Sequence, residues 1–372
     1  MLIGVPKEIK SQEHRVGMTP TSVRETVHHG HGVIVEIDAG LAIGLTDDDY
    51  KAAGAELVGT AAEVFARADM VVKVKEPQPV ECAMLRDGQV LFTYLHLAPD
   101  PDQTRALMAS GATAIAYETV TDDFGGLPLL APMSEVAGRM SIQAGAHCLE
   151  MEQGGRGALL GGVAGVQAAD VVIIGGGVVG TNAARMAVGF EARVTVIERN
   201  LRRLKELDEL FGAKLNTIYS TVDDIERQVL NADLVVGAVL VPGAAAPRLV
   251  SEDMVRQMRR GSVLVDVAID QGGCFETSKA TTHDQPTYKL HDVVHYCVAN
   301  MPGAVARTST FALNNATLPF VLALADKGFK QAMADDAHLK AGLNVHAGRV
   351  TYEAVARDLN LDYQPADEAL AA

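Results

Sequence analysis

The chain has 372 residues, a formal net charge of −15 at pH 7 and a pI of about 5.1. The length predicts two domains. The contents of 48% hydrophobic and 21% charged residues are ordinary for a soluble globular protein, and the excess of acidic residues argues against nucleic-acid binding. No apolar run approaches the roughly 18 residues that span a membrane, no signal-peptide core opens the sequence, and four scattered cysteines without a C-x-x-C pair fit a reducing cytoplasm.

Up to about residue 128, short apolar runs alternate with helical patterns, which predicts a parallel sheet covered by helices on both faces. Thr19 followed by Pro20 predicts the start of a helix, and Gly111 predicts the end of another helix over residues 101–110. The strands predicted in this part of the chain cover residues 2–5, 33–37, 70–74, 90–94 and 113–117.

Further along, a longer helix is predicted over residues 132–151, and a glycine-rich stretch follows it. A second long helix is predicted over residues 308–327. The strands predicted between these two helices cover residues 171–174, 194–197, 215–219, 234–239, 263–267 and 293–298.

Residues 171–198, VVIIGGGVVGTNAARMAVGFEARVTVIE, carry the most specific motif of the chain. Gly175, Gly177 and Gly180 fit G-x-G-x-x-G at the junction of an apolar strand and a helix. Gly175 permits the tight turn, Gly177 lets the backbone approach a pyrophosphate, and Gly180 lets the helix pack close to the strand. The free N–H groups at the start of the helix would face the phosphates. The alternative is an ordinary strand–turn–helix whose glycines serve packing alone.

Glu198 ends the second strand of this motif, about 20 residues after the glycines, as the dinucleotide-binding fingerprint asks. A carboxylate at this position can accept hydrogen bonds from both ribose hydroxyls, and it would repel a 2′-phosphate. The motif therefore favours NAD over NADP as the cofactor.

The segment beyond residue 327 is too short to complete a domain alone, so we expect the chain to cross back into the first domain. We predict an α/β protein with two doubly wound (Rossmann-like) parallel-sheet domains, joined by long helices and with a cleft between them. Residues 1–128 plus 307–372 would form the substrate/catalytic domain. Residues 129–306 would form the NAD-binding Rossmann domain.

Two residues that could carry chemistry follow neighbouring predicted strands. In the run VVKVKEP, Lys73 and Lys75 point to one face, and Lys75 is the better candidate to bind a carboxylate or a carbonyl. His96 ends the run VLFTYLH and titrates near neutrality, which suits a general acid/base. Lys75 and His96 would lie at the same sheet edge. The alternatives are a pair of solvated surface lysines and a hydrogen-bonded structural histidine.

Two further candidates follow other predicted strands. Arg15, in a polar loop, offers a planar fork for a substrate carboxylate, although a solvated arginine is the default for a single loop residue. Asp270, in VLVDVAIDQ, could orient a water or take a proton, and the alternative is a turn aspartate before two glycines. The run His28-His29-Gly30-His31 is interpreted as histidines that favour the end of a helix dipole, and we predict no metal site.

Segments along the whole chain resemble the NAD-dependent L-alanine dehydrogenases, whose wider family includes the NAD-binding component of proton-translocating transhydrogenases. The similarity is collinear from about residue 1 to residue 362. The IDQGGCFE and VANMPG segments, with the Lys75–His96 pair, look most like alanine dehydrogenase. The other segments that carry the resemblance read IGVPKEIKSQEHRVGMTP, VKVKEP, YLHLA, PMSEVAGRMS, AVLVPGA and GLNVHAGRVTYEAVA.

The resemblance implies roles for individual residues. Arg15 and Lys75 would hold the carboxylate and carbonyl of pyruvate or alanine. His96 would be the acid/base, and Asp270 would assist the addition of water and ammonia. The glycine turn, with Val178 against it, would bind the pyrophosphate of NAD, and the rest of the NAD site would be lined by Ser134, Glu198, Arg203, Ser220, Val239, Leu240, Val267, Ile269, Lys279, Val298, Asn300 and Met301.

Two positions depart from the pattern of the family. Glu198 replaces the commoner Asp, which keeps the ribose contact but lengthens it. Lys327 stands where some relatives place a metal-binding His that faces the acid matching Glu118. The second departure argues against a magnesium site in this chain.

The function that the resemblance implies is the reversible oxidative deamination of L-alanine to pyruvate and ammonium with NAD, by a cytoplasmic oxidoreductase. The family is typically hexameric, which implies a homo-oligomer without a nucleic-acid or membrane partner. One alternative is the soluble NAD(H)-binding component of a proton-translocating transhydrogenase, which needs a membrane partner. Another is a non-catalytic, NAD-responsive regulator. The presence of Arg15, Lys75 and His96 together in one chain argues against a protein that only binds NAD.

Overall fold

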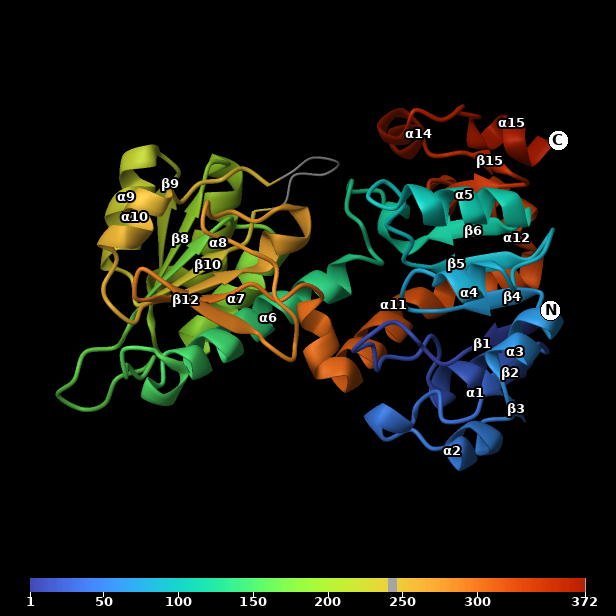
Figure 1. Cartoon of the computed structure of the whole chain (residues 1–372), viewed down its shortest axis with the longest axis horizontal. Helices are drawn as coiled ribbons and strands as arrows, with labels where there is room; N and C mark the ends of the chain where they lie inside the picture. Colours follow the sequence, from blue (N-terminus) through green and yellow to red (C-terminus); the bar gives the residue numbers. More distant parts are fainter. Residues whose placement is uncertain (240–245, 372) are drawn as a thin grey trace. The chain divides into compact units, whose positions relative to one another are not determined.

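The structure is a computed structural model that describes residues 1–239 and 246–371, and it divides into two compact units (Figure 1). The first unit comprises Met1–Met133 and Val305–Ala372, and the second unit comprises Ser134–Ala304. Each unit is built on one β-sheet, so the predicted α/β class with two sheets is confirmed. The cleft expected between the domains stays a prediction.

The boundaries between the two units fall in helical segments, after Met133 and after Ala304. The predicted boundaries were after residues 128 and 306. Helix α6 (Ala131–Cys148) runs through the first boundary, and the short helix η6 (Met301–Val305) ends at the second. A helix continues through a boundary because its hydrogen bonds are local and do not depend on the sheet to which it belongs.

The first unit contains an eight-stranded sheet with the order β15-β14-β6-β5-β4-β1-β2-β3. The strands from β6 to β3 pair in parallel, whereas β14 pairs antiparallel with β6 and with β15. The predicted parallel sheet is therefore confirmed from β6 to β3, and at the other edge the C-terminal part of the chain adds β14 in the opposite direction, followed by β15 antiparallel to β14. The strands are β1 Leu2–Val5, β2 Gly32–Glu36, β3 Glu56–Val58, β4 Met70–Val72, β5 Val90–Thr93, β6 Thr113–Ala116, β14 Leu343–His346 and β15 Arg349–Val350.

The helices of the first unit follow the expected start and stop signals. Thr19 caps α1 by accepting a hydrogen bond from the backbone N–H of Ser22, and α5 ends at Gly111, which has a φ of 71°. No helix that the structure describes is long and apolar enough to cross a membrane. The helical segments are α1 Pro20–His28, η1 Leu41–Ile43, α2 Asp47–Ala52, α3 Ala61–Arg67, α4 Pro79–Cys82, α5 Pro101–Ser110, η2 Tyr117–Thr119, α11 Ala306–Lys327, α12 Phe329–Asp335, α13 Ala337–Lys340, α14 Glu353–Leu359 and α15 Ala366–Ala371.

The strand order of the first sheet reverses between β1 and β4. From β1 the chain builds outward through β2 and β3, and it then returns to add β4, β5 and β6 on the other side of β1. Ligands of open α/β sheets bind outside the carboxyl ends of the strands at such a switch point. Arg15 follows β1, Lys75 follows β4 and His96 follows β5. The strand order therefore brings these three chain segments to one edge of the sheet.

The second unit contains a seven-stranded sheet with the order β12-β13-β11-β10-β7-β8-β9. Every neighbouring pair is parallel except β12 with β13, and the order reverses between β7 and β10. Strand β12 was not predicted. The strands are β7 Asp170–Ile174, β8 Arg193–Glu198, β9 Leu215–Tyr219, β10 Leu234–Gly237, β11 Val263–Asp266, β12 Thr287–Leu290 and β13 Val293–Tyr296.

Alternate residues of β7 enter two different hydrophobic cores. Val171 and Ile173 belong to one core, and Val172 and Ile174 belong to the other. Because successive side chains of a strand point to opposite faces, both faces of this sheet are covered, as the doubly wound fold requires. Besides α6, the helical segments are η3 Met151–Gln153, α7 Val178–Gly189, α8 Leu201–Phe211, η4 Gly212–Lys214, α9 Val222–Asn231, α10 Glu252–Gln257, η5 Val267–Gln271 and η6.

Candidate functional site

Arg15 is buried and is held by a neighbouring carboxylate. Its Nε donates to Glu13 Oε1 at 2.6 Å, its Nη2 donates to Glu13 Oε2 at 2.5 Å, and its Nη1 lies 3.1 Å from Met133 Sδ. The Arg15 side chain is only 2% exposed, which rules out a solvated arginine. Burial alone would lower the pKa of Arg15, but the hydrogen bonds and the charge of Glu13 outweigh burial and raise the pKa. The guanidinium is therefore charged, and its predicted contact with substrate stays a prediction.

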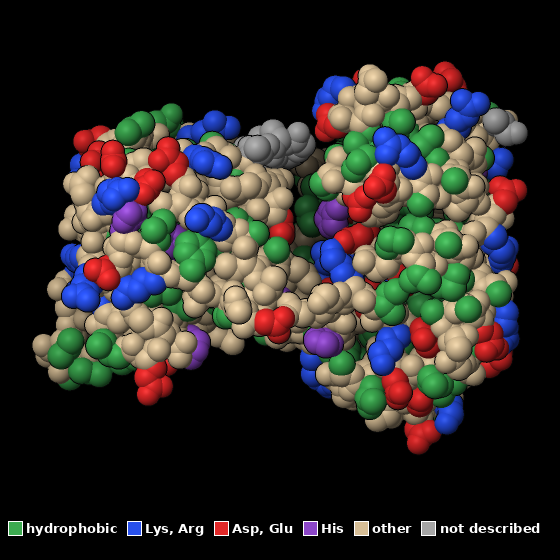
Figure 2. All heavy atoms as spheres, in the orientation of Figure 1, with side chains coloured by type: hydrophobic (Ala, Val, Ile, Leu, Met, Phe, Trp, Pro, Cys, Tyr) green, Lys and Arg blue, Asp and Glu red, His purple; other side chains and the backbone are tan. Residues whose placement is uncertain are grey.

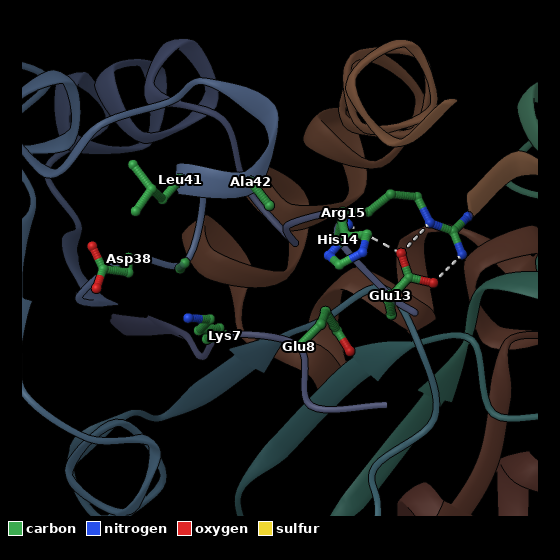
Figure 3. A pocket seen from close by; sticks show the side chains of 9 residues that line it. Lys7, Glu8, Glu13, His14, Arg15, Asp38, Leu41 and Ala42 are labelled. Carbon is green, nitrogen blue, oxygen red and sulfur yellow. Dashed lines mark hydrogen bonds and ion pairs between the residues drawn. The ribbon is translucent and has the colours of Figure 1, made fainter. Parts of the chain in front are cut away.

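A pocket of about 220 Å³ lies beside the loop that follows β1 (Figure 3). Arg15 and Glu13 form one end of it, and Asp38 and Leu41 lie toward the other. Glu8 also lines this pocket. Its lining includes both cationic and anionic side chains.

Lys73 is not the solvated surface lysine that the sequence left open. Strand β4 ends at Val72, and the fully buried Lys73 Nζ donates to Glu8 Oε2 at 3.1 Å and to Glu81 Oε1 at 2.7 Å. Burial alone would lower the pKa of Lys73, but the two carboxylates outweigh burial and raise the pKa. Lys75 is only partly buried. The two lysines therefore differ in environment, and Lys75 remains the candidate for contact with a ligand.

His96 lies three residues beyond the end of β5 and has an unusual backbone conformation. Its φ is 49°, in the left-handed region that non-glycine residues seldom adopt. The imidazole stacks on the ring of Tyr94 with 5.7 Å between the ring centroids, and the His96 side chain is 43% exposed. The hydroxyl of Thr93 donates to Lys75 O at 2.9 Å, which ties the ends of β5 and β4 together. His96 is thus an accessible histidine beside the Lys75 segment, its Nδ1 lies 3.8 Å from Glu118 Oε1, and its acid/base role stays a prediction.

The carboxylate of Glu118 holds the backbone at His96. Glu118 Oε1 accepts a hydrogen bond from the N–H of His96 at 2.6 Å, and both carboxylate oxygens lie 3.2 Å from the N of Leu95. Lys327 Nζ donates to Asp335 Oδ2 at 2.6 Å. These contacts engage both side chains, and the expected absence of a magnesium site stays a prediction. Among the residues that the structure describes, no group of three or more His, Cys, Asp or Glu side chains could hold a metal ion.

The glycine turn of the second unit lies between β7 and α7. Gly175 has a φ of 107°, and a Cβ on Gly180 would lie 1.8 Å from Gly175 O, so these two positions require glycine for the reasons predicted. A Cβ on Gly177 would meet no protein atom within 4 Å. The packing of the chain itself therefore does not require glycine at position 177. A ligand that approaches the backbone there would explain it, and that role stays a prediction.

Glu198 and Arg203 hold the middle of this turn from both sides. Glu198 Oε2 accepts from the N–H of Gly176 at 2.8 Å, and Arg203 Nε donates to Gly176 O at 2.6 Å. Arg203 Nη2 also donates to Thr181 Oγ1 at 2.6 Å. The other oxygen of Glu198 accepts from the next two backbone N–H groups, at 2.8 and 2.9 Å. Glu198, the predicted partner of the NAD ribose, thus also supports the structure of the turn.

The other predicted cofactor residues mostly follow parallel strands of the second sheet. Parallel strands place their carboxyl ends at one edge, where a dinucleotide binds beside the switch point. Ser134 lies in α6, Val178 begins α7, and Lys279 lies in the exposed segment before β12. Leu240 lies outside the described residues. The residues at the strand ends are Ser220 after β9, Val239 after β10, Val267 and Ile269 after β11, and Val298, Asn300 and Met301 after β13.

Asp270 is exposed in η5, directly after β11, and Asp266 anchors the loop that carries it. Asp266 Oδ2 accepts from the N–H of Cys274 at 2.8 Å and from Ser278 Oγ at 2.5 Å. Its Oδ1 accepts from the N–H of Ala268 at 3.1 Å. Burial raises the pKa of Asp266, although these hydrogen bonds oppose the rise. The two acids of this segment therefore differ: Asp266 supports the loop, and Asp270 remains at the ligand edge.

The comparisons with known proteins cover both units. The family model "Alanine dehydrogenase/PNT, N-terminal domain" matches residues 4–137, and "Alanine dehydrogenase/PNT, C-terminal domain" matches residues 141–353. The chain belongs to the alanine dehydrogenase/PNT family. An alanine dehydrogenase of Halomonas elongata is 61% identical to it over 363 residues, which are 98% of this chain and 98% of that protein.

Two solved structures show how the alanine dehydrogenase/PNT fold extends over the chain. A structure described as L-alanine dehydrogenase aligns with a TM-score of 0.94 and 55% identity, and the alignment covers 97% of this chain and 99% of that one. A transhydrogenase from Sinorhizobium meliloti aligns with a TM-score of 0.82 and 25% identity, covering 95% and 100%. The two-sheet α/β fold and the membership of this family are therefore confirmed.

The carboxylates that support the candidate site were missed in the sequence. Glu8 and Glu13 lie in the same short loop as Arg15, and Glu118 follows a strand beside β5. A signal was present, because an acid near a strand end in a parallel sheet lies at the ligand edge. The sequence did not show that Glu8 would accept from the N–H of Val74 or Glu118 from the N–H of His96, since these contacts join segments that are far apart in the chain.

Proposed function

We propose that the chain is an NAD-dependent L-alanine dehydrogenase, which catalyses the reversible oxidative deamination of L-alanine to pyruvate and ammonium. One observation carries the proposal: a single chain combines a glycine turn at the switch point of one sheet with Arg15, Lys75 and His96 at the switch point of the other. The full-length similarity to alanine dehydrogenases supports the choice of reaction.

The second unit fits NAD as the cofactor. The start of α7 presents backbone N–H groups where a pyrophosphate would lie, and the open space at Gly177 leaves room for it. Glu198, at the end of β8, would accept the ribose hydroxyls and repel the 2′-phosphate of NADP. NAD would supply hydride transfer from and to the Cα of the substrate.

The residues of the first unit supply binding and proton transfer in this proposal. Lys75 and Arg15 would bind the substrate carboxylate and polarise its carbonyl, and the bidentate contact with Glu13 directs the Arg15 guanidinium. His96 would take a proton as water adds to the imine and return it in the reverse direction. Asp270 would assist the addition of water and of ammonia.

We further propose a cytoplasmic homo-oligomer, a hexamer as in the relatives that the sequence resembles. The segment between η3 and β7 extends from the second unit in Figure 1 and exposes the apolar side chains of Leu159, Val163 and Val166, each more than 60% accessible. Such side chains in one segment suggest a contact surface. All four cysteines are buried and free of disulfides, which fits a reducing compartment. Light scattering on the purified protein would test the number of subunits.

Small-molecule substrates, not nucleic acid, fit the surface charge. Acidic and basic side chains are interspersed on the face that Figure 2 displays, and the net charge of the chain is −15. A nucleic-acid-binding face would concentrate Lys and Arg.

The test of the proposed function is to mix the purified protein with NADH, pyruvate and ammonium and to follow the absorbance of NADH. We expect NADH to be consumed only when both pyruvate and ammonium are present. The structural match to a transhydrogenase supports one alternative, an NAD(H)-binding component. Such a protein would bind NADH without consuming it under these conditions, and that result would contradict the dehydrogenase.

A further inference from the structure

Both peptide groups of Lys75 are held by side chains from neighbouring segments. Glu8 Oε1 accepts from the N–H of Val74 at 2.7 Å and, at a longer 3.4 Å, from the N–H of Lys75. On the other side, the Thr93 hydroxyl donates to Lys75 O at 2.9 Å. Strand β4 ends at Val72, and beyond it a backbone hydrogen bond from the N–H of Tyr94 to Val74 O at 3.3 Å joins this segment to the segment after β5. The direction in which the Lys75 side chain leaves the backbone therefore depends on these contacts.

The second oxygen of Glu8 belongs to a buried ion network. Glu8 Oε2 and Glu81 Oε1 both accept from Lys73 Nζ, and the three side chains are at most 2% exposed. Burial raises the pKa of Glu8, whereas the charge of Lys73 and the N–H of Val74 oppose that rise. Lys73 therefore favours the ionised form of Glu8, which accepts hydrogen bonds at both oxygens.

Stability alone is a weak explanation for such a network. The cost of removing three charges from water is comparable with the attraction between them, and buried ion pairs can often be replaced by apolar residues without loss of stability. The network does, however, join the loop after β1, the end of β4 and helix α4 at the switch point of the first sheet. Within the network, Glu8 contacts the 74–75 backbone beside the predicted substrate residue Lys75, and its negative charge also contributes to the raised pKa of Arg15.

We propose that Glu8 is the positioning residue of Lys75: its carboxylate fixes the backbone at residues 74–75 and so aims the Lys75 ammonium at the substrate. This inference rests on the proposed function, in which Lys75 binds the carboxylate or carbonyl of the substrate. Glu8 acts through Lys75 and does not itself touch the reacting atoms.

Glu81 provides a matched control within the same network. It pairs with the same Lys73 ammonium and is equally buried, but its other oxygen accepts from the N–H of Gln78 at 2.8 Å and not from residues 74–75. Glu8→Gln and Glu81→Gln therefore remove the same kind of charge from beside Lys73. Only the first change weakens the acceptor that holds the Lys75 segment.

The experiment compares E8Q, E81Q, Lys75→Ala and the double variant Glu8→Gln with Lys75→Ala, all in the full-length chain. For each protein, kcat and KM for pyruvate are measured at saturating NADH and ammonium, together with the melting temperature and the Kd of NADH. We expect E8Q to lower kcat/KM for pyruvate about tenfold more than E81Q, the loss typical of one charge-assisted hydrogen bond. The Kd of NADH should be unchanged, because the glycine turn lies in the other unit.

The double variant separates positioning from general destabilisation. If Glu8 acts through Lys75, Glu8→Gln should lower kcat/KM no further once Lys75 is alanine, because coupled residues are not additive. Equal losses in E8Q and E81Q, or additive losses in the double variant, would overturn the role of Glu8. If Lys75→Ala alone keeps wild-type kinetics, the proposed function of Lys75 fails instead. Should E8Q not fold, Glu8→Asp retains the charge beside Lys73, shortens the reach to Val74, and must show the same coupling.

Discussion

Gly177→Ala is the most informative single change at the proposed NAD site. A Cβ at this position would meet no protein atom within 4 Å, and Gly177 has a φ of −68°, which alanine adopts without strain. Replacing glycine by alanine at such a position stabilises proteins by about 0.4–1 kcal/mol, because the unfolded chain loses freedom. Gly177 is also the N-cap of α7, where glycine is preferred to alanine, and this loss opposes the gain. We therefore expect the melting temperature of the variant to change little.

NADH binding, in contrast, should weaken. If a pyrophosphate packs against the backbone at Gly177, the added methyl group displaces it from the N–H groups at the start of α7. Losing one charge-assisted hydrogen bond is worth about 1.5–3 kcal/mol, which is roughly a tenfold to hundredfold rise in Kd. The variant should thus be as stable as the parent and bind NADH far more weakly.

Gly180→Ala is the matched comparison, measured by thermal unfolding and by NADH fluorescence titration. A Cβ at Gly180 would lie 1.8 Å from Gly175 O, so this change must distort the turn and should lower stability by about 1–3 kcal/mol. Only Gly177→Ala should separate stability from affinity. A Gly177→Ala protein that binds NADH as tightly as the parent would refute the placement of the pyrophosphate.

Three further predictions concern other residues. Glu198→Ser should narrow the preference for NAD over NADP. It should also weaken NADH binding, because Glu198 accepts a hydrogen bond from the N–H of Gly176. A variant that gains NADP use and keeps its NADH affinity, measured by titration, would contradict this double role. His96→Ala should lower turnover about 10²–10⁴-fold, and Asp270→Asn should also be severe, while both keep the Kd of NADH; near wild-type turnover in both would remove the catalytic assignment. Burial lowers the pKa of His295 to about 4 from 6.5, so the unfolded chain binds a proton more readily than the folded one, and the stability linked to His295 is present above pH 6.5 and lost as the pH falls toward 4. His295→Gln should reduce the loss of unfolding free energy between pH 6.5 and pH 4 by about 3 kcal/mol, measured by denaturant titration at both pH values. An unchanged pH dependence would refute this prediction.

The sequence predicted the parts of the fold that depend on local patterns. The Thr19–Pro20 start of α1 and the Gly111 end of α5 follow from capping and from backbone conformation, and both are confirmed. The turn at Gly175 and the close packing at Gly180 are confirmed for the same reason. The sequence did not predict β3, β12, β14 and β15. Strand β3 has only three residues, and β12 and β15 belong to short antiparallel hairpins, whereas the pairing of β14 with β6 depends on where a distant segment returns.

Within the candidate site, the sequence identified residues that a ligand could touch but not the residues that support them. It treated Lys73 as a possible surface lysine, whereas Lys73 is buried between Glu8 and Glu81. It left Arg15 open as a solvated loop residue, whereas Glu13 holds it in a buried pair. Burial of these charges is a property of the folded chain: Lys73 meets Glu8 from the loop after β1, and Arg15 is covered although its partner Glu13 is only two residues away.

The most direct test of the account follows the nitrogen atom. The protein is incubated with pyruvate, NADH and isotope-labelled ammonium, and the product is identified by NMR and by its chirality. The proposed function predicts labelled L-alanine in an amount equal to the NADH consumed. Consumption of NADH without labelled L-alanine, or NADH binding without consumption, would contradict the claim that this chain is an L-alanine dehydrogenase.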